Sequence, residues 1–189
     1  MNYPNGIKRM STVSITTHKN RGMTLENELN LSNEYYREID KAYIYKKPTP
    51  IKITKVDYPS RNKAMIKEGF FTTPSTTDYN GLYKGFYIDF EAKETKSSTA
   101  FALTNIHPHQ IEHLKNIDRH HGIAFLIVRF TTLNETYLLS AKKLNIFLET
   151  TDRQSIPIDF FRSQAHLIKD GYQPRIDYLK IVDNLIGGK

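Results

Sequence analysis

Residues 86–93 carry the most regular alternation of hydrophobic and polar positions in the chain. Successive side chains of a β-strand point to opposite faces, and the aromatic and branched residues of this segment favour a strand. The apolar positions are Phe86, Ile88, Phe90 and Ala92. The polar positions are Tyr87, Asp89, Glu91 and Lys93. The pattern therefore predicts a strand that holds two acids and a lysine on one face, with an apolar face behind them.

The rest of the hydrophobic pattern predicts a succession of helices and strands. Apolar residues at three- to four-residue spacing indicate helices, and alternating or continuous apolar runs indicate strands. The predicted helices cover residues 23–39, 108–118, 142–148, 159–164 and 177–186. The predicted strands cover residues 42–45, 51–56, 64–71, 86–93, 123–130 and 135–140. This order predicts an α/β domain with a mixed sheet, in which 123–130 is buried on both faces and pairs with 135–140.

The two runs at residues 51–56 and 64–71 alternate apolar residues with lysines. A hairpin with so many lysines is unsuited to the centre of a core, so we expect it to protrude from the body or to lie on its surface. Tyr58 and Arg61, between the two runs, suit base stacking and phosphate contact at the tip. A charged edge hairpin that resists aggregation is the alternative interpretation.

Basic charge is concentrated in two segments of the chain. The net charge is +7 and the isoelectric point about 9.4. Residues 1–22 carry +4 without an acid, residues 46–69 carry +5, and all other residues together carry −2. Such concentration suits surfaces that meet a polyanion, although a merely basic protein would share it. Residues 1–19 are expected to form a flexible basic arm, and residues 20–189 a single domain.

Composition excludes several classes of protein. The absence of cysteine excludes disulfides, thiolate zinc sites and cysteine nucleophiles. The chain has no apolar run of about 18 residues that could cross a membrane. The N-terminal residues lead into no apolar region typical of a secretory signal. We therefore expect a cytoplasmic protein associated with the nucleoid.

The strongest chemical signal is an acid, a gap and then Glu-x-Lys. Asp78 lies in the turn-like sequence Thr-Thr-Asp-Tyr-Asn-Gly, thirteen residues before Glu91, and Lys93 follows. Two carboxylates suit Mg²⁺, a hard ion that prefers oxygen ligands, with Mn²⁺ as an alternative ion. A lysine beside them can stabilise the negative charge that develops on a phosphate. The pattern indicates a metal-dependent nuclease, and a half-exposed strand with a solvated polar face is the alternative.

Three other groups of residues suggest a site or a structural role. His109 and His113 share a helix face at the spacing of two zinc ligands, but the protease motif would need a glutamate directly after the first histidine. The pair His120 and His121 favours a helix end, where cations suit the dipole. Glu26, in the first turn of its predicted helix, favours the helix dipole over a catalytic role.

Six blocks of sequence together resemble the RecU family of Holliday junction resolvases. They run in order from about residue 20 to residue 186, across nearly the whole chain. The blocks are Asn20–Glu26, Lys46–Pro50, Ser75–Gly81, Tyr87–Thr95, His109–His113 and Pro174–Tyr178. The resemblance implies a restriction-endonuclease-like fold, a homodimer and Mg²⁺-dependent, paired symmetrical nicking of four-way DNA junctions in recombination and repair.

The resemblance also implies roles for individual residues. Thr76, Asp78, Glu91 and Gln110 would be metal-site residues, and Lys93 would stabilise the transition state. Thr76 and Gln110 rest on the resemblance alone. The segment at about 46–75 corresponds to a stalk that enters the open centre of the junction. The residues expected to contact DNA are Arg21, Lys46, Lys47, Lys52, Lys55, Tyr58, Arg61, Lys63 and Lys67.

The sequence therefore favours a structure-selective endonuclease that acts on four-way DNA. The family further implies an association with the recombinase that forms strand-exchange filaments. The alternative is a non-catalytic protein that binds junctions or modulates the recombinase, in which the basic hairpin matters and the acids are structural.

Overall fold

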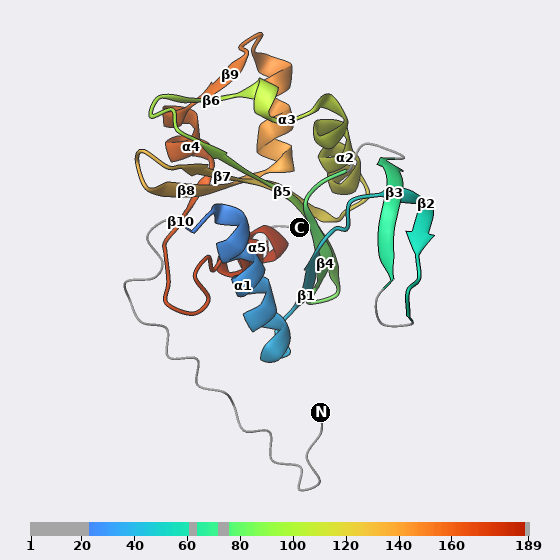
Figure 1. The fold of residues 1–189 in the computed structure, drawn as a ribbon. Coiled ribbons are helices and arrows are strands. Elements are labelled where there is room, and N and C mark those ends of the chain that lie inside the picture. Colours follow the sequence, from blue (N-terminus) through green and yellow to red (C-terminus); the bar gives the residue numbers. More distant parts are fainter. Residues whose placement is uncertain (1–22, 61–63, 72–75, 188–189) are drawn as a thin grey trace, which may run out of the picture.

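The computed structural model describes residues 23–60, 64–71 and 76–187 (Figure 1). The expected arm at residues 1–19 lies outside the described residues, as do Arg21, Arg61 and Lys63. The described residues contain no helix long and apolar enough to cross a membrane.

A six-stranded mixed sheet forms the centre of the molecule, in the order β1-β4-β5-β7-β8-β10. Its strands are β1 (Tyr43–Lys46), β4 (Tyr79–Tyr83), β5 (Phe86–Thr95), β7 (Ile123–Phe130), β8 (Glu135–Ser140) and β10 (His166–Ile168). The central pair β5 and β7 is parallel, and the other pairs are antiparallel. The predicted mixed α/β fold is therefore confirmed.

Helices cover both faces of this sheet (Figure 1). They are α1 (Leu25–Glu38), α2 (Pro108–Arg119), α3 (Ala141–Thr150), α4 (Ile158–Gln164) and α5 (Leu179–Gly187), with a 3₁₀ turn at Leu103–Asn105. The apolar residues of α1 and α5 pack on one face of the sheet, and those of α2, α3 and α4 pack on the other. The sheet thus separates two hydrophobic cores, because each helix must bury its apolar stripe against a layer.

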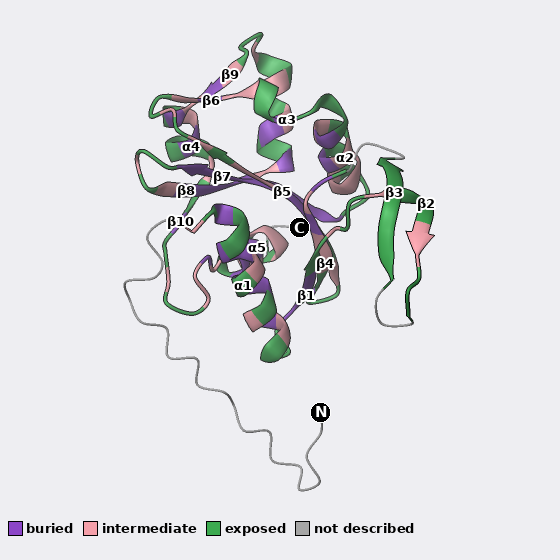
Figure 2. Ribbon diagram, viewed as in Figure 1, coloured by how far each residue is buried: buried purple, intermediate pink, exposed green. Residues whose placement is uncertain are grey.

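Strand β7 lies at the centre of these layers. All of its residues, Ile123–Phe130, are buried, as predicted for a strand covered on both faces (Figure 2). Its hairpin partner β8 pairs with it antiparallel, which is also as predicted. Tyr79 of β4 stacks on Phe90 of β5 at 4.7 Å between ring centroids, and Phe90 stacks on Phe125 of β7 at 4.8 Å. These rings give β5 the aromatic backing that its sequence pattern predicted.

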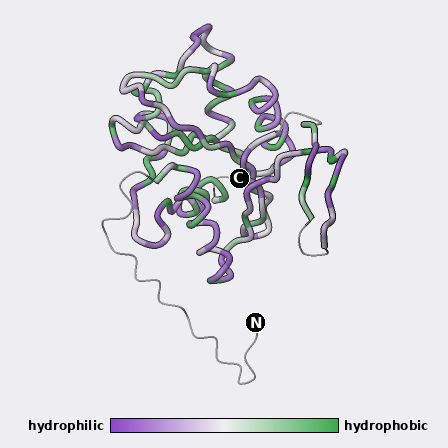
Figure 3. The backbone as a smooth tube through the Cα atoms, in the orientation of Figure 1, coloured by the Kyte–Doolittle hydropathy of each residue, from purple (hydrophilic) through white to green (hydrophobic). Residues whose placement is uncertain are grey.

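The hairpin of β2 (Ile51–Asp57) and β3 (Met65–Phe71) forms a separate two-stranded sheet beside the body (Figures 1 and 2). Hydrophobic and hydrophilic residues are interspersed along it (Figure 3). All of β3 and most of β2 are exposed. The predicted protruding hairpin is therefore confirmed.

The structure corrects the prediction for the segment around Asp78. The turn-like sequence predicted a turn there, but Tyr79–Tyr83 forms the strand β4, paired with β5. Gly81 permits the close approach of β1 to this strand, since a Cβ at this position would lie 2.0 Å from the carbonyl oxygen of Tyr43. The short strands β6 (Ala100–Ala102), β9 (Ser155–Pro157) and β10 were not predicted.

Candidate active site

Two hydrogen bonds tie Asp78, directly before β4, to Glu91 and Ala92 in the middle of β5. The backbone N–H of Asp78 donates to Glu91 Oε2 at 3.0 Å. The backbone N–H of Ala92 donates to Asp78 Oδ2 at 3.1 Å. The antiparallel register, in which Tyr79 pairs with Phe90, brings the two acids to neighbouring positions. The acid and the Glu-x-Lys segment are thus brought together, as the sequence predicted.

Glu91 is completely buried, which changes its acid–base chemistry. Burial, and secondly the nearby charge of Asp78, raise the pKa of Glu91 to about 7 from its ordinary 4.5, and Lys93 opposes this rise. Lys93 Nζ lies 2.5 Å from Glu91 Oε1. This ion pair gives Glu91 Oε1 a charged partner. A carboxylate oxygen has more than one lone pair, so Oε1 retains capacity for an additional ligand.

A cavity of about 340 Å³ lies beside the pair, between the start of α1 and strands β4 and β5. Asp78 and Lys93 line it, and so do Glu26 and Glu94. Glu26, which the sequence assigned to the helix dipole, therefore also reaches the rim of the site. It forms an ion pair with Lys46 there. Its place in the first turn of α1 was visible in the sequence, but the packing of that turn beside β5 was not.

Thr76 and Gln110 are placed less directly. Thr76 is exposed, and its hydroxyl oxygen accepts a hydrogen bond from Lys47 Nζ at 3.1 Å. Gln110 is buried, and its Oε1 accepts the backbone N–H of His107 at 3.0 Å, which caps α2. No contact among the described residues joins either side chain to Asp78 or Glu91. Each oxygen retains a second lone pair, so their roles as metal-site residues stay predictions.

The donor set fits a hard divalent ion. The described residues contain no group of three or more His, Cys, Asp and Glu side chains placed to hold a metal. Asp78 and Glu91 instead offer two carboxylates at neighbouring positions, one of which lines the cavity of about 340 Å³. Mg²⁺ characteristically takes one or two carboxylates and keeps several waters. The chemistry of this pair therefore suits Mg²⁺ better than zinc.

The histidines considered for zinc have other partners. His113 Nε2 lies 3.2 Å from Asp89 Oδ2, and the ring of His109 stacks on that of His107 at 5.3 Å. Helix α2 ends at Arg119, with His120 as its cap, so the predicted helix end is confirmed.

The lysines expected to bind DNA differ in their surroundings. Lys55 lies 3.8 Å from Glu68, and Lys67 lies 2.8 Å from Asp57, in exposed pairs on the hairpin. Lys52 is exposed and has no ion-pair partner in the described part of the chain. Lys47 instead points into the body, where its Nζ lies 2.7 Å from Asp89 Oδ2. Tyr58, near the tip, is 71% exposed.

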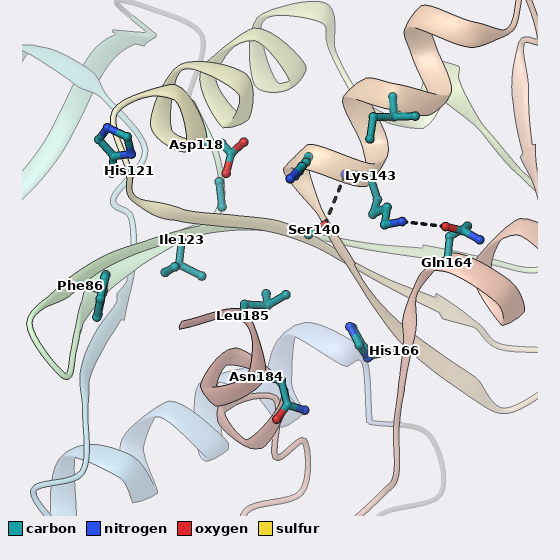
Figure 4. A pocket seen from close by; sticks show the side chains of 13 residues that line it. Phe86, Asp118, His121, Ile123, Ser140, Lys143, Gln164, His166, Asn184 and Leu185 are labelled. Carbon is teal, nitrogen blue, oxygen red and sulfur yellow. Dashed lines mark hydrogen bonds between the residues drawn. The ribbon is translucent and has the colours of Figure 1, made fainter. Parts of the chain in front are cut away.

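A second and larger cavity, of about 740 Å³, lies at the end of the sheet where β5 and β7 begin (Figure 4). Phe86, Ile123 and Leu185 contribute apolar walls. Lys143 Nζ donates to Gln164 Oε1 at 2.9 Å across its rim. Neither Asp78 nor Lys93, which line the smaller cavity, lines this one, so its size alone does not make it the catalytic site.

Comparison with known proteins places the chain in a family. The family described as "Recombination protein U" matches residues 20–184. A Geobacillus sp. (strain WCH70) protein named Holliday junction resolvase RecU is 57% identical over 169 residues, which cover 88% of this chain and 84% of the relative. A protein of the same name from Staphylococcus aureus (strain MRSA252) is 50% identical over 200 residues, with 98% and 96% covered.

Among solved structures, Archaeoglobus fulgidus Hjc, a Holliday junction resolvase, aligns with a TM-score of 0.42 and 11% identity. The alignment covers 71% of this chain and 92% of that one. This likeness is too weak to carry an argument. The family match and the identity to the two sequence relatives show that the chain belongs to the RecU family.

Proposed function

We propose that this protein is an endonuclease that resolves four-way DNA junctions by paired, symmetrical nicks. Membership of the RecU family and the names of its relatives support the junction as substrate. The carboxylates and lysine on β5 and at the start of β4 support hydrolysis of a phosphodiester. With this substrate, the protein would act on DNA in the cytoplasm. The process that it serves would be recombination and repair.

The chain's residues have distinct tasks in this reaction. Asp78 and Glu91 would hold the metal ion, with Thr76 and Gln110 as further candidates. When bound, Mg²⁺ would neutralise phosphate charge and make a coordinated water more acidic. Lys93 brings its ammonium to the same phosphate and stabilises the negative charge that builds up there. Burial on β5 holds these groups in place before the substrate arrives, because Glu91 cannot change rotamer without disturbing the core.

The observation that carries the proposal is the pair of hydrogen bonds that ties Asp78 to Glu91 and Ala92, beside Lys93. A solvated polar strand face, the alternative interpretation, would not bury Glu91 completely. Such a strand face would also have no reason to hold the carboxylates of Asp78 and Glu91 close together, since the repulsion between two negative charges is costly without a cation. The arrangement therefore favours a catalytic role over a merely structural one.

The test is Asp78→Asn, assayed for single-turnover nicking of a four-way junction in Mg²⁺. We expect a loss of about 10³-fold in rate with junction affinity retained, because the change removes a metal-site charge and leaves the hairpin intact. The matched control is Asp183→Asn, since Asp183 pairs with Lys84 at the far end of the β4–β5 hairpin and should not affect nicking. An Asp78→Asn protein that nicks at the parent rate would favour the alternative of a non-catalytic junction-binding protein.

The protein is proposed to act as a homodimer, because two symmetric nicks need two equal sites related by a two-fold axis. One face of the hairpin supports this. Ile51, Ile53, Ile66 and Phe71 are between 48% and 78% exposed. They share a face, because a Cβ at Gly69 would lie 2.8 Å from Ile51 Cγ2 and 3.9 Å from Ile66 Cγ2, and Gly69 pairs with Ile53. An isolated two-stranded hairpin is marginally stable in water, so a second copy of the hairpin is a suitable cover.

The opposite, lysine-bearing face of the hairpin is proposed to contact the junction. The recombinase of strand-exchange filaments is proposed as a further partner on the basis of the family. Co-sedimentation of the protein with recombinase filaments, with and without junction DNA, measures that association directly, and a protein that stays in the supernatant in both cases would contradict it.

A further inference from the structure

Asp89 is a completely buried carboxylate on the polar face of β5, two residues before Glu91. The catalytic proposal gives it no task. A buried charge is costly unless it is paired and hydrogen-bonded, so its partners identify what it holds.

Four side chains contact the Asp89 carboxylate. Lys47 Nζ lies 2.7 Å and Tyr87 Oη 3.0 Å from Oδ2. His113 Nε2, on α2, lies 3.2 Å from the same oxygen. The hydroxyl of Thr77 donates to Oδ1 in a short hydrogen bond. The carboxylate is therefore a hub between β5, α2, the end of β1 and the segment that leads into β4.

Lys47 is bound at every one of its ammonium hydrogens. Besides Asp89, its Nζ donates to Thr77 Oγ1 at 2.6 Å and to Thr76 Oγ1 at 3.1 Å. Its backbone N–H donates to the carbonyl oxygen of Asp78 at 2.8 Å. Its side chain is only 14% exposed. Lys47 thus holds the Thr76–Asp78 segment in place and is poorly available for a phosphate on the surface.

The residues that contact Asp89 lie on both sides of the hairpin insertion in the chain. The protruding hairpin is inserted between Lys47 and Thr76. Lys47 contacts Asp89 at one end of the insertion, and Thr77, directly after the other end, contacts it as well. Asp78, two residues beyond the second end, carries one of the two proposed metal-binding carboxylates. The same carboxylate therefore holds the root of the hairpin and the segment that aligns Asp78 with Glu91.

We infer that Asp89 is a positioning residue for nicking, which clamps both ends of the hairpin insertion to β5 and so fixes Asp78 opposite Glu91. The inference rests on the proposed function. Through the clamp, the orientation of the hairpin is coupled to the relative position of Asp78 and Glu91. A junction that binds the hairpin in its proper orientation therefore also favours the alignment of these two carboxylates. Asp89 acts through Lys47 and Thr77 and does not itself contact the phosphate.

The test compares Asp89→Asn, Lys47→Met and the double variant in single-turnover nicking, junction affinity and thermal unfolding. Each single change should slow nicking by about 10- to 100-fold, since a misplacement of about 1 Å in a catalytic group has effects of this size. Junction affinity should stay within about threefold of the parent, because the exposed hairpin lysines are untouched. Lys47→Met should unfold at the lowest temperature, since it leaves the Asp89 charge buried and unpaired.

The double variant separates positioning from stability. Removal of both charges should recover much of the unfolding temperature that Lys47→Met loses, because no unpaired charge remains. Nicking should stay as slow as in the slower single variant, since the clamp is still absent. Nicking that recovers together with stability would overturn the inference and assign Asp89 a structural role only.

Two further variants complete the design. Tyr87→Phe removes one hydrogen-bond donor to Asp89 but keeps the ion pair with Lys47, so it can be used even if Asp89→Asn does not fold. It should slow nicking by about 2- to 5-fold. A Tyr87→Phe protein that nicks at the parent rate would count against the clamp. Asp183→Asn removes a carboxylate that pairs with Tyr83 at the end of β4 and with Lys84 in the turn between β4 and β5, and it should leave nicking unchanged. A parent protein that fails to nick junctions refutes the proposed function, whereas parent-like nicking by Asp89→Asn refutes only this inference.

Discussion

Strand β5 and the β2–β3 hairpin both alternate apolar with charged residues, yet they are surrounded differently. On β5 the apolar side packs on an aromatic stack, and the acids on the other side are buried with defined partners. On the hairpin both sides face solvent, and its ion pairs are exposed. The same period-two pattern therefore gives a strand with buried, hydrogen-bonded acids in one place and an exposed, charged hairpin in the other.

The two regions differ because burial changes the energetics of a charged side chain and fixes its partners. Exposed ion pairs such as Lys67 with Asp57 contribute roughly 0–1 kcal/mol. The buried Glu91, by contrast, has a raised pKa and a fixed hydrogen-bond partner. Changes on β5 should consequently impair chemistry and leave DNA binding intact, and changes on the hairpin should do the reverse.

Among variants that separate β5 from the hairpin, Lys93→Met is expected to have the largest effect on the nicking rate. The rate of single-turnover nicking should fall by about 10²- to 10³-fold, as for the loss of one charge-stabilising donor, with junction affinity nearly unchanged. Lys96→Met, at an exposed position just after β5, is the matched control and should nick normally. Equal losses in both variants would mean that general charge, and not the placement of Lys93, supports the reaction.

A pH-dependent effect on stability is expected from Glu91 in the metal-free protein. Its pKa is raised to about 7 by burial and by Asp78, so between its ordinary value of 4.5 and 7 the folded state binds the proton more tightly than the unfolded state. The free energy of unfolding should therefore fall as pH rises across this window, by on the order of 2–3 kcal/mol, and level off above it.

Glu91→Gln lacks this titration and provides the comparison. Urea unfolding in EDTA, at several pH values across the same window, should show the glutamine variant gaining on the parent protein as pH rises. A difference between the two proteins that stays constant with pH would contradict the raised pKa.

A smaller effect is expected from the apolar face of the hairpin. Phe71→Ser, at a side chain that is 78% exposed, should weaken the dimer by about tenfold, because one apolar side chain is lost from each hairpin. Sedimentation at several concentrations measures the change. Leu167→Ser, at an apolar residue that is 50% exposed on β10, is the control and should leave the dimer intact. Unchanged association in Phe71→Ser would place the dimer interface elsewhere.

The smallest effect is expected from Lys52→Ala on the hairpin. Junction affinity should weaken modestly, and the slope of log affinity against log salt should decrease by roughly one unit, as for one lost phosphate contact. Lys180→Ala, at an exposed position of α5, should leave the slope unchanged. An unaltered slope in Lys52→Ala would remove this lysine from the DNA-contacting face, while its nicking rate on a bound junction should be normal in either case.

Particular residues show how far the sequence could be taken. Asp78, Glu91 and Lys93 were found because a strand's period and a short acid motif are local signals, and the register of β4 with β5 brought them together. The segment after Asp78 was predicted as a turn, because Asn80 and Gly81 are typical of turns. Pairing with β1 and β5 outweighed that local preference, and the small size of Gly81 admits the neighbouring strand.

Contacts between distant segments could not be predicted from spacing. Glu26 reaches the cavity because α1 starts beside β5, and Lys47 turns inward because Asp89 is buried nearby. The sequence grouped Lys47 with the lysines expected to bind DNA, since charge and position in the hairpin segment were the only signals. Whether a charged side chain faces solvent or a buried partner depends on what packs over it.

Periodicity and residue types within short segments were sufficient to predict the five helices, six of the strands, the buried character of β7, the protruding hairpin and three residues of the candidate site. Strands β4, β6, β9 and β10 became visible only in the folded chain. The same holds for the burial of Glu91 and Asp89, for the two hydrogen bonds of Asp78 to β5, and for the contacts of Lys47 and Thr77 with Asp89. The physical reason is that burial and long-range hydrogen bonds arise when separate segments pack together, and no single segment encodes its neighbours.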